Sequence, residues 1–323
     1  MRLKPFQLWA IITTLATYFL IMVGALVRAS GAGMGCPDWP KCFDRWIPPT
    51  DIRQVPPTID PSLFNVTLAW TEYINRLIGV LIGFFIFATL VLAIRHHRRS
   101  PRILWPTVFA FVGVAFEGWL GSLVVRYHLD PHYVTLHLIV ALMVVSALLY
   151  ATVCAFFEDG RPLDHLPPAR ELLGKVSRAI LGVSLVQVGL GAWLRGDLEV
   201  VGNLNPALAR ELRIEQVGLT DPLHRLMAFV VGALVIGLFL WIRRRFATHV
   251  WLVRTAVFCA GLVGAQIAVG VGLAEAGLPP ALQVLHLGLA SLLTGGLTMV
   301  SLLAYRLPLT GEESSGVVVQ PAH

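Results

Sequence analysis

The chain has 323 residues, of which 56% are hydrophobic and 14% charged, and its mean hydropathy is +0.72. Charged residues make up about 25% of an ordinary soluble domain, so this composition excludes that class of protein. The net charge of +6 does not indicate nucleic-acid binding, because the basic residues are scattered over short segments between apolar runs.

Eight apolar runs are long enough to cross a membrane, since a spanning helix needs about 20 residues. Membrane strands need only about 9–11, so the runs predict an all-α polytopic membrane protein. The first run resembles a signal peptide, but it exceeds the about 7–15 apolar residues of such a signal, and we expect a retained helix. The predicted helices are 8–27, 69–94, 103–125, 133–157, 176–194, 222–241, 250–273 and 281–304.

The basic residues predict the orientation of these helices. By the positive-inside rule, the basic segments and both termini are cytoplasmic. Those segments are 1–4, 95–102, 243–245 and the stretch with Arg161, Arg170, Lys175 and Arg178. The outer loops are then 28–66, 126–132, 195–220 and 274–280. A polar tail, 307–323, is predicted to be disordered.

The chain repeats itself. TEYINRLIGVLIG at 71–83 matches TDPLHRLMAFVVG at 220–232, and LDPHYVTLHLIVA at 129–141 matches LPPALQVLHLGLA at 278–290, both 149 residues apart. GALVR at 24–28 matches GAWLR at 191–195, 167 residues apart. Each half holds four predicted helices, so both halves enter the membrane in the same direction, as in a parallel repeat. We expect two four-helix bundles, formed by 1–157 and 158–306.

The repeat selects four polar positions, Asn75, His137, His224 and His286, each near the outer start of a helix. A lone histidine in a bundle is more often a hydrogen-bonded core residue than a ligand, but a matched pair on repeat-related helices favours ligands. Imidazole is a standard axial ligand of haem iron, and a bundle core can hold haem between facing helices. We predict that His224 and His286 bind one haem from both faces, an arrangement that suits electron transfer or structural support.

Other polar residues carry less information. Glu117 is predicted to be buried in the third helix, where its repeat mate is Gln266. It either hydrogen-bonds within the bundle or serves a proton path. Cys154 and Cys259 are predicted to be small apolar core residues. The histidines outside the apolar runs are predicted to be solvated or at lipid headgroups: His96, His97, His128, His132, His165 and His249.

Five motifs resemble those of the bacterial haem A synthase family, and the resemblance extends from about residue 8 to 305. They are GALVRASGAGMGCPDWPKC (24–42), EYINR (72–76), VTLHLIVAL (134–142), DPLHR (221–225) and QVLHLGLA (283–290). The family oxidises the C8 methyl group of haem O to a formyl group, which gives haem A for terminal oxidases. The resemblance therefore implies an enzyme of the cell membrane.

The resemblance also implies the roles of particular residues. A haem b is expected on His224 and His286, and haem O in the N-terminal half, at the positions of Asn75 and His137. Glu72 matches the family's catalytic glutamate. It shares a helix face with Asn75, three residues on, where a carboxylate suits proton acceptance during oxidation of the methyl group.

Arg76 allows two interpretations. It balances the Glu72 carboxylate or meets a haem propionate at the substrate site. Alternatively, Glu72 and Arg76 form a helix-end ion pair of the kind that Asp221 and Arg225 repeat in the other half.

Asn75 departs from the family, which usually has a histidine there. An amide is a poor iron ligand compared with imidazole, so we expect His137 to be the only strong ligand of haem O. Two other functions stay open at this point. One is a membrane b-type cytochrome in quinone-linked electron transfer, and the other is a non-catalytic haem-binding assembly factor.

Cys36 and Cys42 lie in the first predicted outer loop, and so in an oxidising compartment where disulfides persist. A metal site is less favoured, because the loop contains no histidine. We predict a disulfide that staples the loop. The resemblance implies that it exchanges with extracytoplasmic thiol-disulfide proteins. The other expected partners are membrane lipid, a haem O synthase and an unidentified electron acceptor, with no nucleic acid.

Overall fold

The computed structural model describes residues 3–157 and 166–307, and within these ranges the regular secondary structure is helical, with no β-strand. Eight of the described helices are long and apolar enough to span a membrane, which confirms the predicted fold class. They are α1 (Pro5–Ala29), α2 (Val66–His97), α3 (Pro101–Arg126), α4 (Pro131–Phe156), α5 (Pro168–Leu204), α7 (Thr220–Arg245), α8 (Val250–Glu275) and α9 (Pro280–Arg306). The shorter segments are η1 (Ala32–Met34), η2 (Ile52–Gln54), η3 (Pro61–Leu63) and α6 (Arg210–Gln216).

Local sequence signals set where several helices begin. Proline occupies the first turn of α1, α3, α4, α5 and α9, where its missing N–H leaves no hydrogen bond unmade. Asn65 caps α2 by accepting the backbone N–H of Leu68, so α2 begins three residues before the predicted run. Asp130 caps α4, and the backbone N–H of His132 that it accepts lowers the pKa of that carboxyl.

α5 is much longer than predicted, 168–204 instead of 176–194, because hydropathy detects only the apolar centre of a helix. Arg170, in its first turn, is only 1% exposed. Its guanidinium donates hydrogen bonds to the carbonyl oxygens of Leu303, Ala304 and Leu307 at the end of α9. The positive charge therefore satisfies acceptors that the last turn of α9 leaves open.

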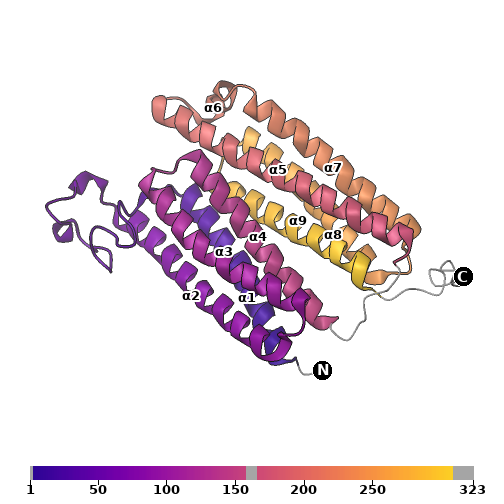
Figure 1. Ribbon diagram of the computed structural model, residues 1–323. Coiled ribbons are helices and arrows are strands. Elements are labelled where there is room, and N and C mark those ends of the chain that lie inside the picture. The colour runs from indigo at the N-terminus through magenta and orange to yellow at the C-terminus, as the bar shows by residue number, and fades with distance from the viewer. Residues whose placement is uncertain (1–2, 158–165, 308–323) are drawn as a thin grey trace, which may run out of the picture.

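The helices form two bundles that share one packing pattern (Figure 1). In the N-terminal bundle, α1 and α3 each contact both α2 and α4. In the C-terminal bundle, α5 and α8 likewise each contact both α7 and α9. The bundles meet where α9 packs against α1 and α4 and where α4 packs against α5. We propose that this correspondence reflects the repeat. The predicted boundary between the halves, at residue 158, lies outside the described residues, which omit 158–165. Most of the predicted tail also lies outside them, since they end at residue 307.

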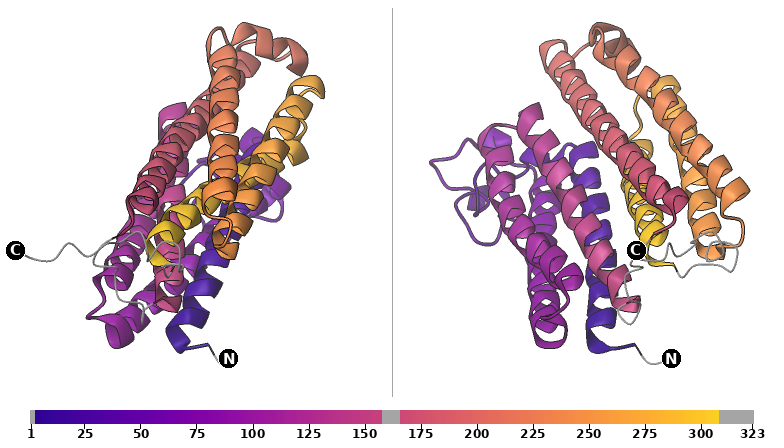
Figure 2. Two further views of the ribbon diagram at one scale, coloured as in Figure 1. Left: turned by 90° about the vertical axis from the view of Figure 1, so that its right-hand side faces the viewer. Right: turned by 45° about the vertical axis from the view of Figure 1, so that its right-hand side comes forward.

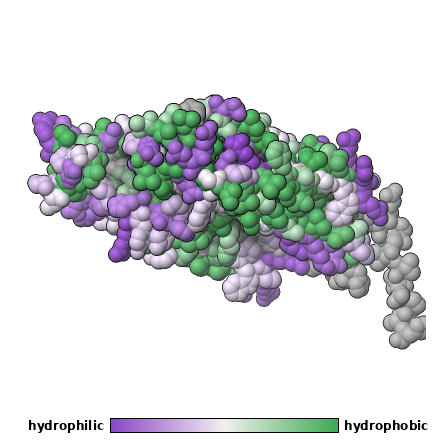
Figure 3. Space-filling model, turned by 90° about the horizontal axis from the view of Figure 1, so that it is seen from above, coloured by the Kyte–Doolittle hydropathy of each residue, from purple (hydrophilic) through white to green (hydrophobic). Residues whose placement is uncertain are grey.

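The outer surface suits lipid. Leu15, Phe84, Trp105 and Phe229 are each more than 60% exposed on the helices, and Figure 3 shows hydrophobic side chains over much of one face. Soluble monomers rarely expose apolar areas of this kind. The start of α1 and the end of α9 lie at the end of the molecule opposite the loop between α1 and α2 (Figures 1 and 2). That placement agrees with a cytoplasmic location for both, which remains a prediction.

Two histidines correct the expectation of solvation. His97 is 5% exposed and its ring packs edge-on against Phe6, while His249 is 7% exposed and packs beside Phe246. Both stand at helix ends where the chain turns back over the bundle, a position that sequence alone does not reveal. The exposed positions of His96, His128 and His132 agree with the expectation, and His165 lies outside the described residues. Cys154 and Cys259 are buried free thiols, as predicted.

Candidate functional site

A cavity of about 370 Å³ lies within the C-terminal bundle, between α5, α7, α8 and α9, with residues of α1 and α4 on one side. His224 on α7 and His286 on α9 both line it, and their ring centroids are 6.5 Å apart. Most of the other lining side chains are apolar. The predicted pair of histidines is therefore brought together in a mostly apolar pocket.

Neighbouring helices hold the two rings close. Gln187 on α5 donates a hydrogen bond from Nε2 to the backbone oxygen of His224 at 2.9 Å, and the same Nε2 lies 3.1 Å from His224 Nδ1. Gly191 lies one turn further along α5, and a Cβ at this position would lie only 2.9 Å from His224 Cε1. At Gly270 on α8 a Cβ would lie 3.3 Å from His286 Cε1. Both glycines thus make room for an imidazole.

The geometry fits a metal between the rings. A metal–imidazole bond is about 2 Å long, so one metal bound to both rings places the centroids roughly 6–7 Å apart. The observed 6.5 Å falls in that range. The side-chain oxygen of Gln266, which lines the same cavity, is buried without a partner among the described residues. The described residues contain no group of three His, Cys, Asp or Glu that would hold a bare metal ion.

Three arginines line the same cavity. Arg28 on α1 and Arg195 on α5, which are repeat mates, both pair with Glu199 at 3.0 Å. Arg225 pairs with Asp221 at 2.8 Å. These side chains are partly exposed, so each pair adds little stability. Their positive charge at the cavity suits a ligand that carries carboxylates.

The N-terminal bundle holds a different set of groups. His137 Nδ1 on α4 lies 2.9 Å from Glu117 Oε2 on α3, so Glu117 makes the contact within the bundle that the sequence allowed for. Asn75 Oδ1 on α2 is buried without a partner in the described part of the chain. The repeat mate of Gln187 is Leu20. The N-terminal bundle therefore lacks both the second histidine and the amide that holds it.

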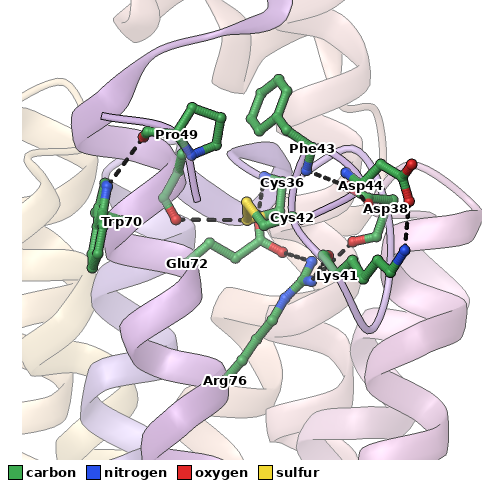
Figure 4. Close-up of a disulfide and its surroundings, with 11 residues drawn as sticks. Cys36, Asp38, Lys41, Cys42, Phe43, Asp44, Pro49, Trp70, Glu72 and Arg76 are labelled. Carbon is green, nitrogen blue, oxygen red and sulfur yellow. Dashed lines mark hydrogen bonds and ion pairs between the residues drawn. A yellow bond between two sulfur atoms is a disulfide. The ribbon is translucent and has the colours of Figure 1, made fainter. Parts of the chain in front are cut away.

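Glu72 accepts a hydrogen bond from the loop that follows α1 (Figure 4). The residue is only 4% exposed, and its Oε2 accepts the backbone N–H of Cys36 at 2.8 Å. Its Oε1 pairs with Arg76 Nη2. Arg76 Nη1 also donates to the backbone oxygens of Asp38 and Lys41, at 2.9 and 2.8 Å. The ion-pair interpretation of Glu72 and Arg76 is thus observed, and the pair also anchors the loop.

Cys36 and Cys42 form the predicted disulfide, and both are fully buried. Their loop sits directly on α2. At Gly35 a Cβ would lie 2.3 Å from the backbone oxygen of Leu68, so only glycine permits this approach. Trp70 Nε1 donates to the backbone oxygen of Pro49 at 3.2 Å and fixes a later part of the loop. The disulfide therefore cross-links a loop that packs closely on α2.

Sequence reasoning missed Gln187 and Glu199. Gln187 was detectable in principle, since it is a lone amide in an apolar run and lies one turn before Gly191. Glu199 gave no signal, because its role depends on α5 continuing past the apolar run and on α1 lying beside it.

The chain is similar to known proteins over most of its length. Residues 7–298 match the COX15-CtaA family, described as cytochrome oxidase assembly protein. A protein named heme A synthase from Alkalihalophilus pseudofirmus is 23% identical over 94% of this chain and 98% of its own length. Proteins of the same name from Shewanella oneidensis and Shouchella clausii are 25% and 26% identical, over 90% and 83% of this chain and 93% and 86% of their own lengths.

Proposed function

The chain belongs to the COX15-CtaA family of cytochrome oxidase assembly proteins, and we propose that it is a haem A synthase whose two bundles bind haem in different ways. It is a multi-pass membrane oxidoreductase that converts haem O to haem A by oxidising a methyl group. The observation that carries the two-site proposal is the facing pair of His224 and His286 in an apolar cavity, with no matching pair in the other bundle.

The C-terminal bundle is the proposed site of a resident haem b. His224 and His286 would hold its iron, and a haem bound in this way supplies one-electron redox chemistry. Gln187 keeps the His224 ring in place, because its side-chain Nε2 donates a hydrogen bond to the backbone oxygen of His224 and also lies beside His224 Nδ1. Arg28, Arg195 and Arg225 supply positive charge for the propionate groups. The mostly apolar lining suits the porphyrin ring.

The N-terminal bundle is the proposed site of the substrate, haem O. His137 is the one imidazole among the repeat-related positions of this bundle, so it binds the substrate iron alone. Asn75 lies opposite by analogy with His224, and its amide can hydrogen-bond water or hydroxide on that side. An iron with only one strong protein ligand has a free position for chemistry, whereas one bound by two histidines does not.

Glu72 is the proposed catalytic carboxylate, which accepts a proton as the methyl group is oxidised. Its place on the same face of α2 as Asn75, one turn away, supports this role. Arg76 and the N–H of Cys36 hold the carboxylate in one orientation. The same bonds make Glu72 part of the loop anchor, so its chemical and structural roles must be separated by experiment.

Asn75 also favours a second candidate, a haem-binding assembly factor that has lost its substrate site. Pigment extraction separates the two. Cells that make a haem O synthase and this chain are expected to contain haem A, and cells with the His137→Ala variant are expected to contain none. Haem O alone in both extracts, with the protein present in the membrane, would refute the enzyme.

A further inference from the structure

We infer that Glu117 is a positioning residue for the substrate site: it accepts the Nδ1 proton of His137 and makes that imidazole a stronger ligand for the iron of haem O. The inference rests on the proposed function, which assigns haem O to His137. It goes further because it gives His137 a fixed orientation and a greater strength as an iron ligand than its repeat mate, His286, would have.

The position of Glu117 calls for an explanation. The residue lies in the middle of α3, only 12% of its side chain is exposed, and its Oε1 is buried without a partner among the described residues. An ionisable group within a membrane helix is expensive, and such residues usually pair inside the bundle. The contact that the structure gives Glu117 is His137 Nδ1, 2.9 Å from Oε2.

The repeat supplies an internal comparison. The mate of Glu117 is Gln266 on α8, and the mate of His137 is His286. Gln266 and His286 line the same cavity, and the side-chain oxygen of Gln266 has no hydrogen-bond partner in the described structure. Each acceptor residue precedes a glycine by one turn, Gly121 or Gly270, which leaves space beside the histidine ring. The two bundles thus share this framework but differ in charge: a carboxylate serves the substrate side and a neutral amide the other.

The chemistry of this difference is general. A histidine that binds a metal usually donates its other ring N–H to a carboxylate or carbonyl, which fixes the tautomer and raises the basicity of the ligand. On the substrate side, the repeat pairs His137, a strong ligand, with Asn75, a weak one. That combination leaves one side of the iron open. Two neutral histidines in the other bundle close both sides and suit electron transfer.

The test is the iron–histidine stretching band in the resonance Raman spectrum of the full-length protein, purified with haem O and reduced. His137→Ala assigns the band by abolishing it. Glu117→Gln keeps the size of the side chain and removes the charge, so the band is expected to move to lower frequency. Retention of haem O is expected to fall about 10–100-fold. Glu117→Asp keeps the charge and is expected to restore the band in part.

The low-spin haem of the C-terminal bundle is the folding control within the same molecule, since Glu117→Gln should leave its spectrum unchanged. A band that stays in place in Glu117→Gln, while this control is intact, overturns the inference and leaves the proposed function standing. If the wild type has no band that depends on His137, the assignment of haem O to His137 fails, and the inference fails with it.

Discussion

The Glu72 carboxylate on α2 accepts the backbone N–H of Cys36 at 2.8 Å, so a side chain of a membrane helix directly holds the disulfide loop that covers it. Arg76 completes the link through the backbone oxygens of Asp38 and Lys41. The loop and the proposed catalytic carboxylate therefore form one structural unit. A change in either is expected to affect the other.

Two substitutions of Glu72 separate its roles. Glu72→Gln keeps an acceptor for the Cys36 N–H and removes the base, so the loop is expected to stay protected from hydrogen exchange while haem A formation falls about 10²–10⁴-fold. Glu72→Ala removes both, so loop protection is lost as well. The measurements are exchange of the amides of 35–45 and haem A in extracts. Normal haem A formation by Glu72→Gln would rule out the catalytic role.

The disulfide is expected to stabilise the loop and to support the position of Glu72. Replacing Cys36 and Cys42 together by serine removes a cross-link worth about 2–3 kcal/mol for so short a loop, by the chain-entropy model. Faster hydrogen exchange is expected at 35–45, with no change in α8. Because both sulfurs are buried, reduction by a thiol protein should require the loop to open first. Equal exchange in the wild type and the double variant would show that the packing alone holds the loop.

Gln187 is expected to support haem b through His224. Gln187→Leu copies the residue at the equivalent position, Leu20, and removes both contacts to His224. Occupancy of the low-spin haem is expected to fall about 10–100-fold, as for other residues that orient metal ligands. Gln283→Leu is the matched control, because Gln283 lines the same cavity but donates to the backbone oxygen of Leu278. Equal occupancy in both variants would contradict the role of Gln187.

Loss of either His224 or His286 is expected to have the same effect on the spin state of haem b. Alanine at either position leaves the haem b iron with one imidazole, so both variants should lose the low-spin signal in electron paramagnetic resonance. His137→Ala should keep that signal. A low-spin signal that survives both His224→Ala and His286→Ala would place the resident haem elsewhere.

Asn75 predicts the spin state of the substrate haem. With His137 as the only strong ligand, the haem of the N-terminal bundle should be high spin, and Asn75→His should convert it to low spin. Electron paramagnetic resonance of protein loaded with haem O measures this directly. Asn75→Asp is the control, since it changes the side chain without adding an imidazole. A low-spin N-terminal haem in the wild type would contradict the prediction that His137 is the only strong ligand.

The sequence predicted the eight helices because a membrane demands long apolar runs, and it predicted the histidine pair because the repeat aligned two helices. It did not predict the ends of α5, since polar residues such as Arg170 extend a helix without adding hydropathy. The Glu72–Cys36 bond also escaped prediction. It depends on how Gly35 lets the loop approach α2, which is a matter of backbone position and not of pattern. The partners of Arg28 and His224 likewise depend on which helices become neighbours.

The central claim is that one histidine, with Asn75 opposite, makes a working substrate site. The most direct measurement compares haem A in extracts of cells that express a haem O synthase with either the wild type or Asn75→His. We predict that the wild type forms haem A. If the wild type forms none and Asn75→His does, the site has lost its activity through Asn75, and the account is wrong.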